Sequence, residues 1–398
     1  MTIERVVIVG GGLAGLRTAE ELRGRGYPGG ITLLGAEWRP PYDRPPLTKK
    51  LMTGELDDTT LAADFGKLGV TARLGEPATG LTGGAVQAGH AEHPFDILVL
   101  ATGAEPVRLP GDGPQRVLRT LDDALAVRAA LRPGTRLAIV GAGWIGAELA
   151  TAAARLGCQV TVVEAAGAPL AGALGAETGA VTAAWYAAAG VDLRLGQAVA
   201  SVEPGGLALP GGGWLPADEV VTAVGVRPQT GWLAGTGLQL DNGVAVDGHL
   251  RASLPGVYAV GDCAAFSSRR YGRRLRVEHW DNALHGPAAA AANILGGDTE
   301  YDPVPYFWSE QFGRMVQYAG HHGAGDRLVW RGDPAAEKWT ACWLADGGPG
   351  GGPRLVALLT VGRPRDLVQG RRVIEAQQPV DQALLADPEV PLRAVAPG

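Results

Sequence analysis

The stretch Val6-Val7-Ile8-Val9-Gly10-Gly11-Gly12-Leu13-Ala14-Gly15 joins an apolar run to a glycine-rich turn, and a second copy begins at Leu137. In this pattern the first glycine permits a tight turn, the second lets backbone approach a pyrophosphate, and the third lets a helix pack close to the strand. The helix N-terminus adds N–H donors and a partial positive charge. The first copy therefore predicts dinucleotide contacts at Gly10, Gly12, Leu13, Ala14 and Gly15. The second predicts them at Gly141, Gly143, Trp144, Ile145 and Gly146.

Each glycine-rich turn is followed, about 20 residues on, by an acid that could bind a ribose diol. The first acid is Glu37, for which a solvated loop position is the alternative. The second is Glu164, directly after the apolar strand 159–163. A carboxylate there repels a 2′-phosphate, and the stretch 165–171 has no arginine to attract one. The second site is therefore predicted to prefer NADH to NADPH, and a chain with two such sites is predicted to move electrons between two dinucleotides.

The composition limits the class of protein. With 398 residues, 46% of them hydrophobic and 19% charged, the chain is expected to be a soluble globular protein of two or three domains. A net charge of −6 argues against a nucleic-acid binder. Cys158, Cys263 and Cys342 form no CxxC pair, which argues against a dithiol relay and a metal site. No signal peptide or long apolar window is evident, so we expect a cytoplasmic protein without membrane contact.

The order of patterns predicts an α/β fold with two Rossmann-like dinucleotide-binding domains of the glutathione-reductase type. The apolar stretch 256–260 and its following Gly261-Asp262 read as a strand that returns to the first domain, so the second domain is inserted into the first. From Tyr306, short alternating runs predict a small α+β domain with an antiparallel sheet. The predicted boundaries are residues 1–108 and 234–305 for the FAD-binding domain, 109–233 for the NAD-binding domain, and 306–398 for the C-terminal domain.

A proline-rich segment, residues 39–47, lies between the first Rossmann unit and two lysines. Four prolines in this span predict a rigid, extended loop. Arg44 and Lys49 could neutralise a pyrophosphate or stabilise negative charge on a reduced flavin, although either Lys49 or Lys50 could be a surface residue. Glu148, just inside the second predicted helix, either contacts a nicotinamide or complements the positive helix N-terminus.

These features together resemble the FAD-dependent ferredoxin reductases of bacterial oxygenase systems, the putidaredoxin-reductase-like enzymes, with apoptosis-inducing factor as a more distant relative. The match runs through the whole chain in order. Its segments are 9–15, 41–49, 98–103, 141–150, 225–228, 256–262, 276–283 and 305–312. The proline loop, the Glu278-His279-Trp280 segment and the stretch Pro305-Tyr306-Phe307-Trp308-Ser309 are the most specific.

The resemblance implies that hydride passes directly from NADH to FAD, and that single electrons then pass to a [2Fe–2S] ferredoxin that feeds an oxygenase. It implies FAD contacts at Gly12, Leu13, Ala14, Glu37, Arg44, Lys49, Thr102, Arg119 and Asp262. Glu278, His279 and Trp280 would lie beside the flavin and nicotinamide rings, and Gly225 would face the second dinucleotide. Lys49, Glu148 and Trp280 are the predicted catalytic residues. The chain departs from the family at Ala36, where an acid is usual, and after Glu164, where arginines are usual.

A run of five arginines precedes Glu278, and we call it the arginine cluster: Arg269, Arg270, Arg273, Arg274 and Arg276. On an acidic protein it could dock an acidic ferredoxin, or it could be a solvated hairpin. Two other functions remain open at this point. One is a flavin oxidase or reductase that acts directly on a small molecule, and the other is a redox-sensing protein like apoptosis-inducing factor. A monomer and a homodimer are both compatible with the sequence.

Overall fold

The computed structural model describes residues 3–347 and 351–396 and divides into two compact units. Unit 1 comprises residues 1–43, 60–105 and 227–305, and unit 2 comprises residues 44–59, 106–226 and 306–398. Two of the crossings between the units lie within β8 (Ala104–Pro106) and β16 (Val226–Pro228). Residues 44–59, with Lys49 among them, therefore belong to the unit that holds the second glycine-rich turn. The four-segment division predicted from the sequence remains a prediction.

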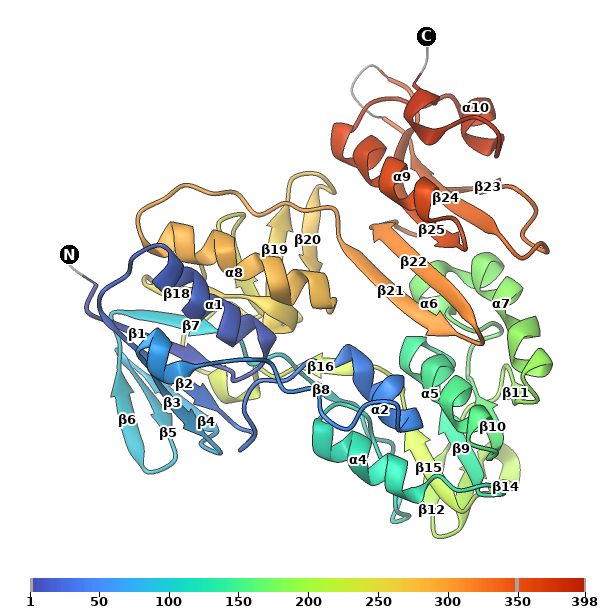
Figure 1. The fold of residues 1–398 in the computed structure, drawn as a ribbon, viewed down its shortest axis with the longest axis horizontal. Coiled ribbons are helices and arrows are strands. Elements are labelled where there is room, and N and C mark those ends of the chain that lie inside the picture. The colour runs from blue at the N-terminus through green and yellow to red at the C-terminus, as the bar shows by residue number, and fades with distance from the viewer. Residues whose placement is uncertain (1–2, 348–350, 397–398) are drawn as a thin grey trace. The chain divides into compact units, whose positions relative to one another are not determined.

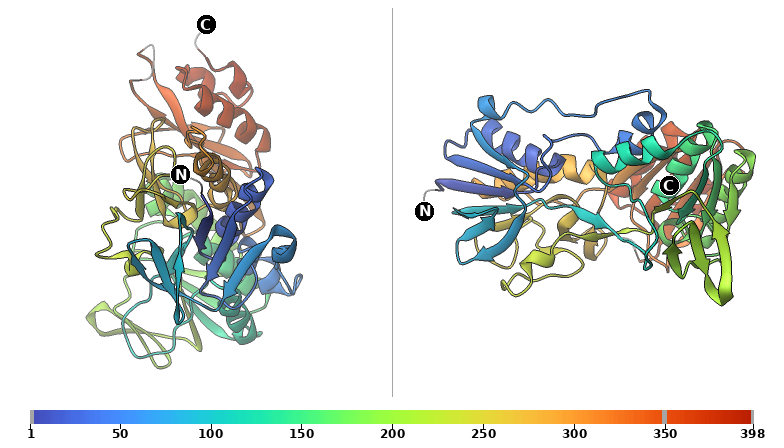
Figure 2. Two further views of the ribbon diagram at one scale, coloured as in Figure 1. Left: turned by 90° about the vertical axis from the view of Figure 1, so that its left-hand side faces the viewer. Right: turned by 90° about the horizontal axis from the view of Figure 1, so that it is seen from below.

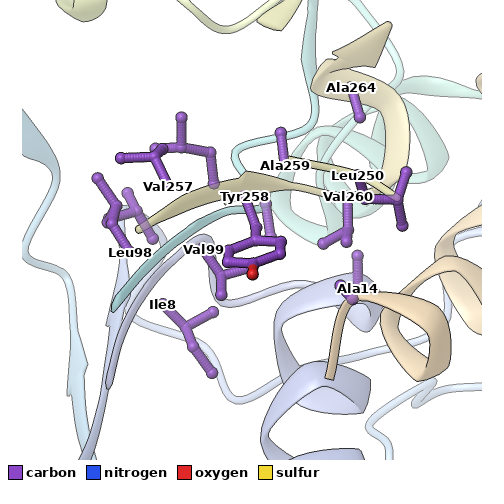
Figure 3. Close-up of a cluster of buried hydrophobic side chains, with 14 of the residues drawn as sticks. Ile8, Ala14, Leu98, Val99, Leu250, Val257, Tyr258, Ala259, Val260 and Ala264 are labelled. Atoms are coloured by element: carbon purple, nitrogen blue, oxygen red, sulfur yellow. The ribbon is translucent and has the colours of Figure 1, made fainter. Parts of the chain in front are cut away.

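Unit 1 is built on a five-stranded parallel sheet. In sheet order its strands are β18 (Val257–Ala259), β7 (Ile97–Leu100), β1 (Arg5–Val9), β2 (Gly30–Gly35) and β3 (Val70–Leu74). Residues 6–9 of β1 are all buried, which is typical of a central parallel strand covered on both faces. Ile8, Val99 and Tyr258 point from three neighbouring strands into one apolar cluster with Ala14 of the first helix (Figure 3). This cluster fixes the helix that follows the glycine-rich turn against the sheet.

The helix after the first turn, α1 (Leu13–Gly24), packs against α8 (Trp280–Ile294) from near the end of unit 1 (Figure 1). The two helices remain neighbours in the other views (Figure 2). The sequence predicts α1 to Gly26, and the helix ends two residues earlier. The remaining elements of unit 1 are α3 (Phe65–Leu68), the antiparallel strands β4 (Ala78–Thr82), β5 (Ala85–Ala88) and β6 (Ala91–Pro94), and the strands β17 (Val244–Val246), β19 (Ala264–Ser268) and β20 (Arg273–Arg276).

Unit 2 contains a second parallel sheet, of four strands, in which a glycine-rich turn again joins a strand to a helix. In sheet order its strands are β11 (Asp192–Arg194), β10 (Gln159–Val163), β9 (Arg136–Val140) and β15 (Glu219–Thr222). The helix after the glycine-rich turn is α5 (Trp144–Arg155). The other elements around this sheet are α4 (Leu121–Ala130), α6 (Ala171–Leu174), α7 (Ala176–Ala188) and the antiparallel strands β12 (Ser201–Glu203), β13 (Gly206–Leu209) and β14 (Gly213–Pro216).

The proline-rich segment differs from its predicted extended form. Pro45–Thr48 forms a 3-10 turn, and α2 (Lys50–Thr53) follows it directly. Proline is compatible with the first turn of a helix because the N–H that it lacks has no partner there, and its fixed φ already suits a helix. The prediction of an extended loop is therefore wrong from Pro45 onward.

The C-terminal part of unit 2 is a five-stranded antiparallel sheet. In sheet order its strands are β21 (Tyr306–Gln311), β22 (Arg314–Gly320), β25 (Arg354–Val361), β24 (Trp339–Ala345) and β23 (Arg327–Arg331). Helix α9 (Pro364–Ala376) packs on β22 and β25, and α10 (Gln382–Ala386) packs on β23 (Figure 1). Two parallel-sheet dinucleotide folds and a small α+β domain are thus present, and the predicted fold class is confirmed.

A buried arginine holds the end of the chain to the C-terminal sheet. Arg331 is 1% exposed and pairs with Asp366 of α9 at 3.0 Å. Its guanidinium also donates to the backbone carbonyls of Leu385, Asp387, Pro388 and Val390. Five acceptors around one buried cation compensate the cost of removing it from water.

We predict that Arg331→Ala lowers the free energy of unfolding by about 3–5 kcal/mol, because Asp366 and four carbonyls lose a buried donor. Arg327→Ala is the matched control on the same strand, since Arg327 pairs with Asp346 in solvent, and it should cost no more than about 1 kcal/mol. Urea unfolding followed by circular dichroism measures both. Equal losses in the two variants would contradict the role of Arg331.

Candidate functional site

In unit 1, the predicted dinucleotide residues lie at the carboxyl ends of neighbouring parallel strands. Gly10 follows β1 with φ +125°, and a Cβ on it would lie 2.0 Å from the carbonyl oxygen of Ala101, which follows β7. Gly261 follows β18, and a Cβ on it would lie 3.0 Å from that of Ala14 in α1. Three segments therefore lie close together at this edge of the sheet: Ala101-Thr102, Gly261-Asp262 and the N-terminus of α1. Ligands of open parallel sheets bind at such an edge.

The N-terminus of α1 fits a pyrophosphate. Its N-cap residue is Gly12, and no side chain caps the helix. By contrast, α4 begins with a complete capping box formed by Thr120 and Asp123. The first backbone N–H groups of α1, at Leu13 and Ala14, are positioned as the sequence predicts for binding an anion.

Glu37 lies two residues beyond β2, where the ribose-binding acid of a Rossmann fold is expected. The hydroxyl of Tyr42, in the proline-rich segment, donates to its carboxylate at 2.5 Å. Tyr42 is buried, so it orients Glu37 from a fixed position. Ala36, where the resemblance implies that an acid is usual, is exposed and has no side-chain group that could bind a ribose.

Trp280 is the first residue of α8, and its indole N–H donates to Asp43 at 2.6 Å. His279 is the N-cap residue of α8, and no side chain caps this helix. Glu278 forms an ion pair with Arg276 at 2.5 Å. Asp43 has no role predicted from the sequence, although it lies inside the segment 41–49 that carries the resemblance. The Asp43 carboxylate thus fixes the orientation of the Trp280 indole, which the resemblance places beside the flavin and nicotinamide rings.

In unit 2, the second glycine-rich turn has the same geometry as the first. Gly141 has φ +105°, and a Cβ on it would lie 2.4 Å from the carbonyl oxygen of Ala223 after β15. Gly143 is the N-cap of α5, which no side chain caps, and a Cβ on Gly143 would meet no atom within 4 Å. This open space in front of an uncapped helix fits a pyrophosphate. Gly225, with φ +100°, also borders open space.

Glu164 follows β10 and is held by the backbone around it. Its two carboxylate oxygens accept hydrogen bonds from the N–H groups of Ala142 at 2.7 Å and Ala166 at 2.8 Å. Burial raises the pKa of Tyr186, and the negative charge of Glu164 raises it further. The acid thus lies beside the glycine-rich turn, where a ribose diol is expected.

No basic side chain follows Glu164 in the loop 165–170, where Ala168 and Leu170 are buried. On the neighbouring strand, the backbone carbonyl of Arg194 accepts the N–H of Glu164 at 2.9 Å. The Arg194 side chain pairs with Asp192 at 2.9 Å. The structure therefore shows no replacement cation on the loop itself.

Glu148 is a buried acid of unit 2 that binds three side chains. It is 5% exposed and lies one turn into α5. Its Oε2 accepts hydrogen bonds from Lys49 Nζ at 2.6 Å and Thr48 Oγ1 at 2.5 Å. Its Oε1 accepts one from Ser309 Oγ of β21 at 2.6 Å. This arrangement places the predicted pair Lys49 and Glu148 in one ion pair and adds two hydroxyl partners that sequence reasoning did not find.

Other predicted residues of unit 2 surround this pair. The ring of Trp144, at the start of α5, contacts that of Phe307 edge-on, with centroids 4.5 Å apart. Ile145 is 41% exposed. Arg44 Nη1 donates to the carbonyl oxygen of Arg119 at 2.6 Å. Flavin contacts of Arg44, Lys49 and Arg119 remain predictions.

The cysteines do not form a redox pair. Cys158, Cys263 and Cys342 are all free, and the latter two are buried. Burial raises the pKa of the Cys263 thiol and raises that of Cys342 to about 12. Within residues 3–347 and 351–396, no group of three potential ligands could hold a metal ion. Over the same residues, no helix is long and apolar enough to cross a membrane.

Comparisons with known proteins identify the family. Residues 4–286 match the pyridine nucleotide-disulphide oxidoreductase model, and residues 306–396 match a reductase C-terminal model. The chain is 38% identical to the 5,5′-dehydrodivanillate O-demethylase ferredoxin reductase subunit of Sphingobium sp., over 97% of each chain. The chain belongs to the ferredoxin reductase family. It is an oxidoreductase, and the enzymes of this family use FAD and a nicotinamide dinucleotide.

Solved structures agree with this assignment. A structure of a protein named Fdr9 matches with a TM-score of 0.94 and 48% identity, over 99% of this chain and 100% of that one. Putidaredoxin reductase, in a covalent complex with putidaredoxin, matches with a TM-score of 0.92 and 32% identity, over 98% of each chain. Several other relatives are reductase components of dioxygenase systems. The family resemblance seen in the sequence is confirmed.

The open space at Gly143 gives a test of the second dinucleotide site. We predict that Gly143→Ala keeps the wild-type thermal midpoint and weakens NAD⁺ binding on the order of tenfold, because the added methyl displaces about one backbone hydrogen bond to phosphate. Gly146→Ala should instead lower the midpoint, since its Cβ would lie 2.0 Å from the carbonyl oxygen of Gly141. Calorimetric titration with NAD⁺ and thermal unfolding separate the two effects. Unchanged NAD⁺ affinity in Gly143→Ala would place the pyrophosphate elsewhere.

Proposed function

We propose that this enzyme takes electrons from NADH, holds them on FAD and delivers them singly to a [2Fe–2S] ferredoxin that supplies an oxygenase. The observation that carries the proposal is the duplicated site: each unit has an uncapped helix after a glycine-rich turn and an acid after the next strand. The absence of a cysteine pair leaves no dithiol relay through which electrons could pass. A cytoplasmic location remains a prediction.

The residues of unit 1 fit FAD. Gly12, Leu13 and Ala14 would face its pyrophosphate, and Glu37, oriented by Tyr42, would accept hydrogen bonds from its ribose. The FAD held there would supply the chemistry of accepting a hydride and releasing electrons one at a time. The protein contributes binding, orientation and electrostatics, so no side chain is required to act as an acid or a base.

The residues of unit 2 fit NADH. Both oxygens of Glu164 are anchored by backbone N–H groups, so the carboxylate would be held in place to accept a hydrogen bond from an adenosine 2′-hydroxyl. A 2′-phosphate there would face a fixed negative charge. The loop 165–170 offers no cation to offset this repulsion. The nicotinamide end would lie toward Glu148, which is one of the two roles that the sequence left open for this residue.

We predict that Glu164→Gln reduces the preference for NADH over NADPH in kcat/KM at least tenfold, or about 1.4 kcal/mol, because the repelling charge is removed and an acceptor oxygen is kept. Asp218→Asn is the control, since Asp218 precedes β15 at the opposite edge of the same sheet. Steady-state rates with both nucleotides measure the ratio. A wild-type enzyme that prefers NADPH would refute this role of Glu164.

The arginine cluster is the proposed docking surface for the ferredoxin, and its charge is partly balanced. Arg269 pairs with Glu300, Arg274 with Asp241 and Arg276 with Glu278. The backbone N–H of Arg270 donates a hydrogen bond to the carboxylate of Asp302 at 2.8 Å. Arg269 is 81% exposed and Arg273 is also exposed, so these two are best placed to attract an acidic partner.

The function is tested by ferredoxin-dependent reduction of cytochrome c, with NADH as the donor and a [2Fe–2S] ferredoxin as the carrier. We predict turnover that depends on the ferredoxin, and a several-fold lower kcat/KM for it in the double variant Arg269→Gln, Arg273→Gln at low ionic strength. The difference should shrink at high salt, and ferricyanide reduction should stay unchanged. Arg25→Gln, another exposed arginine of unit 1, is the control.

Two outcomes would contradict the proposal. Turnover of a small molecule without ferredoxin, together with no ferredoxin-dependent rate, would favour an oxidase or reductase that acts directly on its substrate. Equal loss of ferredoxin and ferricyanide activity in the double variant would indicate a folding defect and would remove the arginine cluster as a docking surface.

A further inference from the structure

Strand β21 of the C-terminal sheet lies along helix α5, which carries the second glycine-rich turn. Three contacts join them within unit 2. Phe307 packs on Trp144, Ser309 donates to Glu148, and the backbone N–H of Phe312 donates to Thr151 at 2.9 Å. The α5 partners are spaced by four and three residues and so share one helix face. The inward side of β21 is therefore matched to the face of α5 that carries Glu148.

The hydrogen bonds of Ser309 run from Gln311 through the Ser309 hydroxyl to Glu148. Ser309 is 1% exposed, and its hydroxyl has a single proton, which it donates to Glu148 Oε1 at 2.6 Å. The same hydroxyl accepts from Gln311 Nε2 at 3.0 Å. Gln311 is fully buried on the same strand. Two residues of the C-terminal sheet thus form a relay of donors that ends on the carboxylate.

The carboxylate of Glu148 has few acceptor sites left. A carboxylate offers about four lone-pair sites. Lys49 and Thr48 use two on Oε2, and Ser309 uses one on Oε1. The remaining site is on Oε1, the oxygen whose direction Ser309 sets. The position of Ser309 therefore decides where Glu148 can accept one more hydrogen bond.

This relay is costly if its role is packing alone. Polar groups buried without full pairing lower stability, and Gln311 Oε1 is buried with no partner in the part of the chain that the structure describes. An apolar pair at positions 309 and 311 would fill the same strand face without that cost. The relay is explained if its donors are needed at Glu148.

We propose that Ser309 and Gln311 are positioning residues for hydride transfer, and that through them the C-terminal domain orients Glu148 toward the carboxamide of the nicotinamide. This inference rests on the proposed function, because Glu148 is taken to face the donor dinucleotide. The C-terminal domain then contributes to the NADH site itself through the Ser309 hydroxyl.

The test compares Ser309→Ala with wild-type holoenzyme in anaerobic stopped-flow reduction by NADH and in calorimetric titration with NAD⁺. The limiting rate at saturating NADH should fall about tenfold, as expected for loss of one hydrogen bond to a charged group. NAD⁺ affinity should change less than about twofold, because Glu164 and the glycine-rich turn supply most of the binding. A merely structural residue would lower the thermal midpoint and leave the limiting rate unchanged.

Matched variants keep the test independent of folding. Ser309→Thr retains the hydroxyl and should recover most of the rate. Gln311→Leu removes only the second donor and should give a smaller loss in the same direction. Thr360→Val removes another buried hydroxyl from the same sheet, one that has no partner among the described residues, and should leave the rate and NAD⁺ affinity as in wild type.

A double-mutant cycle with Glu148→Gln tests whether Ser309 changes the limiting rate through Glu148. If Ser309 acts only through Glu148, Ser309→Ala should cause little further loss in the Glu148→Gln background. Two results would overturn the proposed positioning role. One is a double variant whose limiting rate falls by the product of the two single losses, and the other is a Ser309→Ala rate within about twofold of wild type. A wild-type enzyme that NADH fails to reduce would instead refute the proposed function, and this inference would fall with it.

Discussion

The buried carboxylate of Glu148 is the constraint on which unit 2 depends. An ionised acid at 5% exposure is stable only with paired charge and satisfied hydrogen bonds. Lys49 provides the opposite charge, and hydroxyls from Thr48 and Ser309 donate two further hydrogen bonds to the carboxylate. These partners come from residues 44–59 and from the C-terminal sheet. One acid on α5 therefore binds side chains from two other segments of the same unit.

The two dinucleotide sites share one physical origin, which is the parallel sheet. Parallel strands place their carboxyl ends at the same edge, so residues far apart in sequence meet there. In unit 1 this edge gathers Gly10, Thr102 and Gly261, and in unit 2 it gathers Gly141 and Glu164. The matching close approaches of Gly10 to Ala101 and of Gly141 to Ala223 show that both turns obey the same steric rule.

Local patterns allowed the fold class and the turn residues to be predicted, because spacing along one strand–turn–helix unit is set by nearby sequence. The partners of the predicted residues could not be predicted in the same way. The bond from Ser309 to Glu148 spans 161 positions, and that from Trp280 to Asp43 spans 237. The arginine cluster shows the same limit, since the acids that balance it, Glu300 and Asp241, lie outside the run.

The central claim is that a permanent flavin site and an NADH site exchange electrons, and one measurement tests it most directly. The absorption spectrum of the purified protein is recorded during anaerobic titration with NADH. We expect bound FAD whose oxidised absorption bleaches rapidly and is fully bleached near one equivalent of NADH per flavin. A protein purified without flavin under conditions that retain it in relatives, or a flavin spectrum that NADH leaves unchanged, would contradict it.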